Sequence, residues 1–372
     1  MNIGFDAKRA FFNQTGLGNY SRDTIRILTE NYSENQYHLF TPKSASNDRL
    51  TFLNKKNIYV QTPKKALGNI APSIWRRWGI KSDLIQLKID LFHGLSHELP
   101  IGIEKTNIKT IVTIHDLIFI RYPKFFKTID RKIYFNKFKH SCKIADKIIA
   151  VSQQSKNDII KFFDINPDKI DVVYQGCNHI FKKTIGQELK EEIRQKFHLP
   201  EKFILHVGTI EERKNLLTIL KCVKELPNEK LVVIGNGSNY KKKCLQYIKE
   251  HQLEKKIIFL NELTLFEMAA IYQIAEIFIY PSIFEGFGIP IIEALYSKTP
   301  VITTINGCFS EAGGPSSLYI DPLNVQEMKE AILKIKNNPI LTEKQIAEGY
   351  NYVQQFNDEN IAKNLMKSYL SI

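Results

Sequence analysis

The sequence has little that would suit a membrane or secreted protein. It contains no apolar run of the roughly 20 residues that a membrane-spanning helix requires, and its opening residues MNIGFDAKRA lack the apolar core of a secretory signal. We therefore expect a cytoplasmic protein. The five cysteines are scattered, without the C-x-x-C spacing of a zinc or redox site. We expect buried thiols at these positions: Cys142, Cys177, Cys222, Cys244 and Cys308.

Metal-binding patterns are also missing. No D-x-D pair occurs, and no group of His, Asp and Glu has the spacing of metal ligands. We therefore expect chemistry without a metal and without a bound cofactor.

Acidic residues are scarce in the first half of the chain. Residues 1–180 hold 28 Lys+Arg against 16 Asp+Glu, a net +12, whereas the remainder holds 24 against 23, a net +1. Signatures of zinc fingers, RRM domains and homeodomains are absent, so we expect no nucleic-acid partner. An anionic membrane surface or a phosphorylated acceptor would explain the basic half equally well.

The densest basic region is Lys124 to Lys147. At helical spacing its aromatic and small apolar side chains share one face and its lysines share another, which predicts a basic amphipathic helix. Such a helix either packs its apolar face on a domain core or lies on an anionic bilayer. The sequence leaves both possibilities open.

The length of the chain and the alternation of strand and helix patterns predict two α/β domains. A chain of 372 residues exceeds the usual limit for one core. Short apolar runs that end in polar residues or glycine alternate with helical patterns, which favours βαβ units in both halves. We expect strands at 2–7, 37–42, 57–63, 89–94, 109–116, 147–152 and 170–176, then at 202–209, 230–237, 256–263, 276–282 and 299–304. The charged stretch Lys182–Lys196 is predicted to be the linker region.

The stretch SIFEGFGIPIIEAL, Ser282 to Leu295, carries two glutamates eight positions apart. Glu285 follows a predicted strand, and Glu293 falls in the first turns of the next helix, where Pro290 suits the helix start. Glycines between them let the backbone approach a ligand. The pair is either two solvated surface carboxylates or a pair of acceptors for vicinal hydroxyls at the carboxyl edge of a sheet.

Three further candidates lie at predicted strand ends. Gly16, Leu17 and Gly18 precede a helix and could bring bare N–H groups to an anion, although Ser21 stands where a dinucleotide fingerprint would have its third glycine. His115 and Asp116 end the strand VTIHD. A histidine there is either structural or catalytic.

The cations Arg213 and Lys214 directly precede a helix in the loop after the first strand of the second half. A guanidinium fork and an ammonium beside free backbone N–H groups suit a diphosphate. They could equally be a solvated surface pair.

Together these segments resemble a known family. EGFGIPIIE resembles the E-x7-E signature of retaining glycosyltransferases, and with GTIEERKNL, VTIHDL, TGLGNY and KIIAVSQQSKNDI the chain is similar to glycosyltransferase family 4 over nearly its whole length. The resemblance implies the GT-B fold, in which two Rossmann-like doubly wound domains face each other across a cleft. It assigns residues 1–182 to an acceptor domain, 183–352 to a donor domain, and 353–372 to a helix that crosses back to the first domain.

The same resemblance assigns roles at the donor. Glu293 would hold the ribose hydroxyls and Glu285 those of the transferred sugar, while Arg213 and Lys214 would neutralise the leaving diphosphate without a metal. His115 would contact the donor sugar, and Asp116 would support either the histidine or the acceptor. The Gly16–Gly18 loop would approach the phosphate and the acceptor. The backbone of the remaining predicted donor-binding residues would contact base, sugar and phosphate: Leu263, Phe287, Gly288 and Ile289.

Some residues depart from the family pattern. Thr209 stands where many relatives have an arginine, so Arg213 would carry more of the diphosphate charge. QGCN, Gln175 to Asn178, replaces the usual N-G-V-D near the interdomain junction.

The resemblance is strongest to bacterial mannosyltransferases that build polysaccharide from GDP-mannose. We expect such a donor and a glycan or lipid-linked acceptor. The basic region leaves open a peripheral position on the inner face of the plasma membrane. The sequence leaves UDP-glucose, UDP-N-acetylglucosamine or a deoxysugar donor open. A sugar-nucleotide epimerase or a non-catalytic membrane scaffold is a weaker alternative, because the set of Glu285, Glu293, Arg213 and Lys214 is intact.

Overall fold

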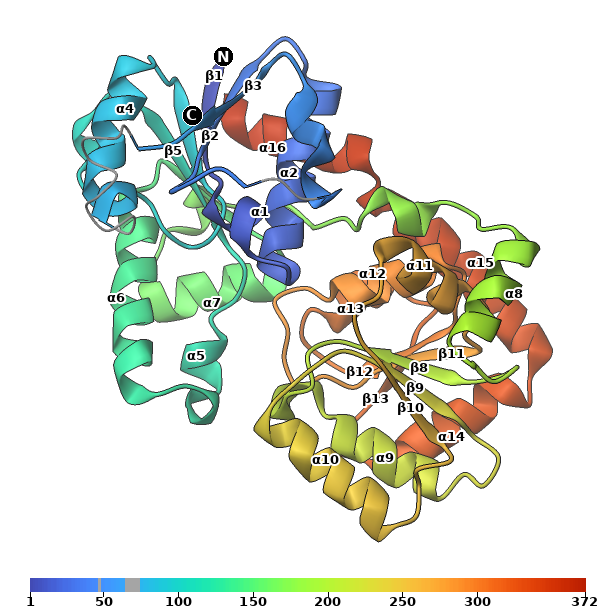
Figure 1. Ribbon diagram of the computed structural model, residues 1–372. Coiled ribbons are helices and arrows are strands. Elements are labelled where there is room, and N and C mark those ends of the chain that lie inside the picture. The colour runs from blue at the N-terminus through green and yellow to red at the C-terminus, as the bar shows by residue number, and fades with distance from the viewer. Residues whose placement is uncertain (46–47, 64–73) are drawn as a thin grey trace. The chain divides into compact units, whose positions relative to one another are not determined.

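The computed structural model describes residues 1–45, 48–63 and 74–372, and the chain divides into two compact units. Unit 1 holds Met1–Gly176 and Phe356–Ile372, and unit 2 holds Cys177–Gln355. Each unit is built on a parallel sheet with helices around it, as Figure 1 shows. The two Rossmann-like α/β domains expected from the sequence are therefore confirmed.

The sheet of unit 1, within the described residues, has seven parallel strands in the order β3-β2-β1-β4-β5-β6-β7. Its strands coincide with the predicted apolar runs, which supply side chains to both faces of a buried sheet. They are β1 (Asn2–Asp6), β2 (Gln36–Phe40), β3 (Ile58–Gln61), β4 (Leu91–Gly94), β5 (Lys109–Ile114), β6 (Lys147–Ala150) and β7 (Ile170–Val172).

Helices of unit 1 cover this sheet, and the last helix of the chain is one of them. It packs on α2, and its Tyr369 hydroxyl lies 2.6 Å from Nδ1 of the buried His93. The helices are α1 (Lys8–Phe12), α2 (Gly16–Asn31), α4 (Ile80–Gln86), α5 (Ile118–Arg121), α6 (Thr128–Ile144), α7 (Gln153–Phe163) and α16 (Asp358–Leu370).

Unit 2, as far as it is described, has six parallel strands in the order β10-β9-β8-β11-β12-β13. In Figure 1 helices α9, α10 and α14 lie on one face of this sheet and α11, α12 and α13 on the other. The strands are β8 (Ile204–Val207), β9 (Leu231–Ile234), β10 (Ile257–Leu260), β11 (Ile277–Tyr280), β12 (Val301–Thr304) and β13 (Leu318–Ile320). The helices are α8 (Gln187–Lys196), α9 (Leu216–Lys224), α10 (Asn239–Glu250), α11 (Leu265–Ile274), α12 (Ile289–Tyr296), α13 (Phe309–Gly313), α14 (Val325–Lys336) and α15 (Pro339–Val353).

The unit boundaries differ from the expected ones after Lys182 and after residue 352. Phe181 is buried and meets Tyr272 of α11 edge-on, with ring centroids 5.6 Å apart, so the turn that contains it belongs to unit 2. At the return crossing Phe356 packs against Tyr174 of unit 1 at 5.6 Å. These two aromatic contacts set the boundaries.

The linker prediction for Lys182–Lys196 is wrong. Most of that stretch forms α8, which packs on α11. Ile193 is buried there, and Lys196 donates to Glu267 at 2.6 Å. The helix has few apolar residues among many charged ones, so the sequence does not show the helical spacing of apolar positions.

The basic region between Lys124 and Lys147 is mainly α6. Its Phe138 and Cys142 are buried in the core of unit 1, so the predicted apolar face packs on protein. Near the start of the helix, however, Ile129 and Ile133 lie one turn apart and are 72% and 43% exposed.

Candidate functional site

The loops after β8 and β11 meet at the point where the strand order of unit 2 reverses. β8 pairs with β11, and the chain leaves these neighbouring strands toward opposite edges of the sheet. Such a reversal leaves a crevice at the carboxyl edge, where open α/β sheets bind their ligands. Arg213, Lys214 and Glu285 come from these two loops.

Backbone geometry holds the two cations in place. The N–H of Ile283 donates to the carbonyl of Arg213 at 2.9 Å, which joins the two loops. Asn215, with φ +61°, turns the chain into α9. Gly208, with φ +148°, allows the backbone conformation that leads out of β8, and the Lys214 side chain lies against it.

Glu285 is the centre of a buried charge cluster. Its Oε1 lies 2.6 Å from Lys214 Nζ and 2.7 Å from Arg213 Nη1. Burial raises the pKa of the Glu285 carboxyl, but the charges of Arg213 and Lys214 outweigh burial and lower the pKa to about 2. Glu285 is therefore ionised at neutral pH, and it can accept hydrogen bonds but cannot donate a proton.

The two cations of the cluster differ in their surroundings. Burial lowers the pKa of Lys214, although the Glu285 carboxylate opposes that effect. Arg213 also donates to the carbonyl of Phe284 at 2.7 Å and pairs with Glu211. The cluster thus holds two cations around one buried carboxylate.

Tyr280 is a member of this cluster that the sequence did not reveal. Its hydroxyl donates to Glu285 Oε1 at 3.0 Å and accepts a hydrogen bond from Lys214. Burial and then the Glu285 charge raise the pKa of Tyr280 well above its ordinary value, so the hydroxyl keeps its proton. In the sequence Tyr280 is simply the last apolar residue of a strand.

Glu293 has a different environment from Glu285. It is buried in α12, and its Oε2 accepts a hydrogen bond of 3.0 Å from the hydroxyl of Tyr272 on α11. The two glutamates of the signature therefore have separate partners, as two separate roles would require. Tyr272, too, was not identified from the sequence, where it lies between the predicted strands at 256–263 and 276–282.

The residues predicted to contact the donor through their backbone lie at the starts of α12 and α11. Gly288, with φ +117°, is the N-cap of α12, and the preceding Phe287 is buried. Ile289 begins the helix, whose N-terminus favours an anion. Leu263 follows β10, next to Thr264, which caps α11 in a reciprocal capping box with Glu267.

In unit 1, His115 is buried with both ring nitrogens engaged. Nε2 lies 3.0 Å from the carbonyl oxygen of Leu95, and Nδ1 lies 3.1 Å from Nε2 of Gln175. Burial lowers the pKa of His115 to about 4, so the ring is neutral at pH 7. These contacts orient the ring and oppose a role as a general base.

Asp116 follows His115 directly and is half-buried. Its Oδ1 accepts a hydrogen bond from the N–H of Ile118 at 3.1 Å, which starts α5. The predicted support of His115 by Asp116 stays a prediction. Gln175 supports the histidine, at a position where the sequence departs from the family pattern.

The Gly16–Gly18 segment is not a loop with bare N–H groups throughout, and that expectation needs correction. These residues form the first turn of α2, and the N–H of Gly18 donates to Thr15 O at 3.0 Å and to Asn13 Oδ1 at 3.2 Å. A Cβ at Gly18 would lie 1.8 Å from the Asn13 carbonyl oxygen, so close packing demands this glycine. Gly16 and Leu17 still lie at the helix N-terminus.

Across the described parts of the chain, no three His, Cys, Asp or Glu side chains gather as metal ligands would. The metal-free mechanism stays a prediction. Within the same residues no helix is both long and apolar enough to cross a bilayer.

Two protein-family models match the chain, one on each half. The model for Glycosyltransferase Family 4 matches residues 15–179, and the model for Glycosyl transferases group 1 matches residues 189–352. Between them they account for most of the sequence.

Curated relatives agree with this assignment. The O-antigen chain mannosyltransferase RfbU of Salmonella typhimurium is 29% identical over 277 residues, covering 74% of this chain and 71% of that protein. The O-antigen chain mannosyltransferase B of Escherichia coli is 25% identical over 393 residues, covering 99% of both.

A solved structure shows the same fold. The Anabaena protein HepE, crystallised with UDP-glucose, superposes with a TM-score of 0.78 at 17% identity, covering 100% of this chain and 99% of that one. The fold, the charge cluster and both family models lead to one conclusion: this chain belongs to family 4 of the glycosyltransferases and is a glycosyltransferase with the GT-B fold.

Proposed function

We propose that this enzyme transfers a hexose, with GDP-mannose as the first candidate donor, to a glycan or lipid-linked acceptor in the synthesis of a cell-surface polysaccharide. The observation that carries the proposal is the buried cluster of Arg213, Lys214 and Glu285 at the reversal point of unit 2. The names of the two O-antigen mannosyltransferases support mannose as the sugar and polysaccharide as the product.

The cluster suits the departure of a diphosphate. Bond breaking between the anomeric carbon and the phosphate oxygen places growing negative charge on the leaving group. Arg213 and Lys214 supply two fixed cations in a buried site, where such charges stabilise a transition state more strongly than in water. In this proposal the cations take the place of a metal ion.

The two glutamates divide the remaining work. Glu285 stays ionised and accepts hydrogen bonds from hydroxyls of the transferred sugar, and Tyr280 holds it in position. Glu293, oriented by Tyr272, accepts hydrogen bonds from the ribose. Neither residue needs to exchange a proton in these roles.

We further propose that the anomeric configuration is retained. The acceptor oxygen would attack the anomeric carbon from the face that the diphosphate leaves, and the leaving phosphate oxygen would take the acceptor's proton. His115 would contact the donor sugar through its neutral ring, which Leu95 and Gln175 hold in place at its two nitrogens.

A panel of nucleotide sugars tests the donor and the mechanism. Binding by calorimetry and hydrolysis in the presence of chelator should be strongest with GDP-mannose, and NMR of the product should show the donor's anomeric configuration. If the enzyme prefers UDP-glucose, the ligand of the Anabaena protein, GDP-mannose is not its donor. An absolute requirement for a divalent ion, or an inverted product, would overturn the mechanism.

We also propose that the enzyme works at the inner face of the plasma membrane. Exposed Ile129 and Ile133 on α6 lie beside the exposed lysines Lys127 and Lys132, a combination that suits an anionic bilayer surface.

Flotation with anionic liposomes tests this membrane proposal. Wild-type protein should float at low salt and less at high salt, because added salt screens the lysines. The double variant Ile129→Ser with Ile133→Ser should float less, whereas Leu245→Ser, at a 43% exposed position of unit 2, serves as the control. Equal flotation of all three proteins would contradict the proposal.

A further inference from the structure

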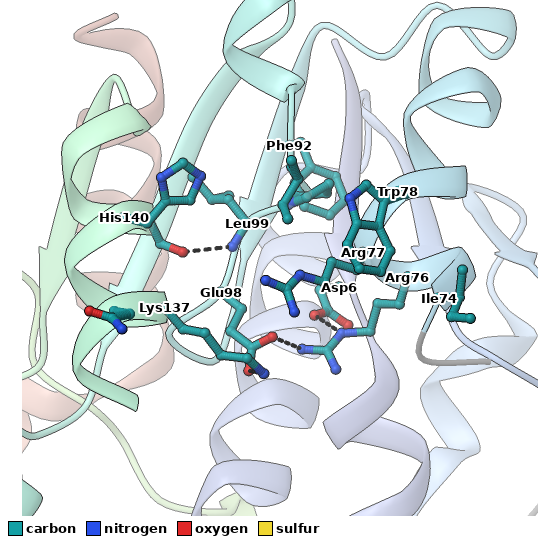
Figure 2. A pocket seen from close by; sticks show the side chains of 14 residues that line it. Asp6, Ile74, Arg76, Arg77, Trp78, Phe92, Glu98, Leu99, Lys137 and His140 are labelled. Carbon is teal, nitrogen blue, oxygen red and sulfur yellow. Dashed lines mark hydrogen bonds and ion pairs between the residues drawn. The ribbon is translucent and has the colours of Figure 1, made fainter. Parts of the chain in front are cut away.

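Unit 1 has a reversal point of its own, and a pocket lies there. β1 and β4 are neighbours in the sheet, and the strand order runs away from them in both directions. A pocket of about 470 Å³ opens beyond their carboxyl ends, bounded by Asp6 at the end of β1, Phe92 of β4 and the segment 98–101 after β4. Figure 2 shows it. Its volume is in the range of small-molecule sites.

A row of paired charges forms one wall of the pocket. Arg76 Nε donates to Asp6 Oδ2 at 2.7 Å, and Arg76 Nη2 donates to Glu98 Oε2 at 3.1 Å. Lys137 Nζ lies 3.3 Å from Glu98 Oε1. Figure 2 shows Asp6, Arg76 and Glu98 side by side, with Lys137 reaching Glu98 from α6. The hydrogen bonds and ion pairs within the row orient these side chains without a ligand.

An indole ring provides an apolar wall. Trp78 lines the pocket and is 51% exposed, with the Arg77 guanidinium 4.8 Å from its ring centre. The other tryptophan of the chain, Trp75, is buried and donates to Asp83 at 2.9 Å. Exposure of a large aromatic surface beside a pocket is typical of binding sites.

Helix α6 supplies further polar groups from one of its faces. Asn136, Lys137 and His140 all line the pocket, and they follow Ile133 at helical spacing. One face of α6 therefore carries both the residue Ile133, which we propose to face the membrane, and the polar residues of this pocket.

The chemistry of these walls favours a neutral saccharide over a bare anion. A sugar ring has an apolar C–H face, which an indole can cover, and vicinal hydroxyls that both donate and accept. Paired carboxylates and guanidinium groups offer both kinds of partner at fixed spacing. Asp6 and Glu98 already pair with Arg76 and Lys137 in this wall, so an inorganic anion would have to displace a carboxylate to pair with either cation.

We propose that this pocket binds a sugar unit of the acceptor glycan, with Trp78 under the ring and the row Asp6–Arg76–Glu98–Lys137 along its hydroxyls. The inference rests on the proposed transferase function and adds a specific acceptor subsite to it.

Saturation-transfer NMR on the full chain tests the binding directly, without any need for turnover. The probes are methyl α-mannoside and inorganic phosphate. Methyl α-mannoside should give a signal that falls at least fivefold in Trp78→Ala and persists in Tyr59→Ala, a matched change at a 42% exposed aromatic residue of the same unit. The absence of a saccharide signal, equal signals in both variants, or displacement of the saccharide by equimolar phosphate would overturn the proposal.

A kinetic test separates the pocket from the donor site. Trp78→Ala and Lys137→Met should raise the acceptor KM at least tenfold and leave the donor KM within twofold. An equal rise in donor KM would contradict an acceptor subsite. If wild-type protein transfers no sugar from any nucleotide donor, the proposed function fails, and the NMR result still decides whether the pocket binds a saccharide.

Discussion

The strand order reverses once in each sheet, and the two places differ in what lies at the carboxyl ends of the strands: a charge cluster in unit 2 and an open pocket in unit 1. In unit 2, Arg213 and Lys214 both lie against the carboxylate of Glu285, and Arg213 also pairs with Glu211. In unit 1, Arg76 bridges Asp6 and Glu98 along a wall, and an open pocket remains beside it. A parallel sheet provides the place for a ligand, and the loop residues determine which ligand that is.

Removal of a cation in unit 2 should have the largest effect. Arg213→Ala should lower kcat by about 100- to 1,000-fold, the usual loss when one preorganised charge at a developing anion is removed. Arg213→Lys, which keeps the charge but not the fork, should recover part of the rate. Circular dichroism would confirm that both variants fold. A wild-type kcat in Arg213→Ala would contradict a catalytic role for the charge cluster of unit 2.

Acid should weaken unit 2 through Glu285. Its pKa is lowered on folding, so its contribution to stability is complete above the unfolded value near 4.5 and is lost as pH falls toward about 2. Over that window we expect a loss of up to about 3 kcal/mol in the free energy of unfolding. Urea titrations of wild-type protein and Glu285→Gln at pH 6 and pH 3 measure it. An identical pH dependence of both proteins would refute the buried ion pair.

The second glutamate should affect binding more than rate. In its proposed role Glu293 accepts hydrogen bonds from the ribose, so Glu293→Ala should lower donor affinity about 10- to 100-fold, as loss of a hydrogen bond to a charged group predicts. Tyr272→Phe removes only the group that orients Glu293, and its effect should be smaller. Calorimetry with the nucleoside diphosphate alone measures both. A larger loss for Tyr272→Phe than for Glu293→Ala would reverse the assigned order of roles.

The smallest effects should come from the first turn of α2 in unit 1. Gly18→Ala forces a Cβ against the Asn13 carbonyl and should destabilise unit 1 by about 1–3 kcal/mol. Gly16→Ala meets nothing within 4 Å and should leave the stability almost unchanged. Thermal unfolding of the pair measures the difference. Equal stability of the two variants would restore the interpretation of Gly18 as a ligand-binding glycine.

Much of the fold could be predicted because it depends on local pattern. The strands are short apolar runs, and Gly288 and Pro290 mark the start of α12 in the sequence itself. β13 was missed because its three residues, Leu318–Ile320, are too few to show a period. α8 was mistaken for a linker because charged residues surround its few apolar ones.

The site could be predicted only in part. The sequence itself shows the candidate residues Arg213, Lys214 and Glu285. The contact of Lys214 with Glu285, 71 residues apart in the chain, depends on the pairing of β8 with β11. Tyr280 and Tyr272 act through single hydroxyls that look like core residues in a sequence. The pocket of unit 1 joins side chains from five separate stretches of the chain, so no short sequence motif contains them.

The most direct test of the central claim is the transfer rate of Glu285→Gln with the best donor. This change keeps the shape of the side chain but removes the charge that holds Arg213, Lys214 and Tyr280 together. If the cluster is the catalytic centre, kcat should fall by at least about 100-fold, as for the loss of one preorganised group, while the nucleoside diphosphate still binds. A variant with wild-type kcat would contradict the claim.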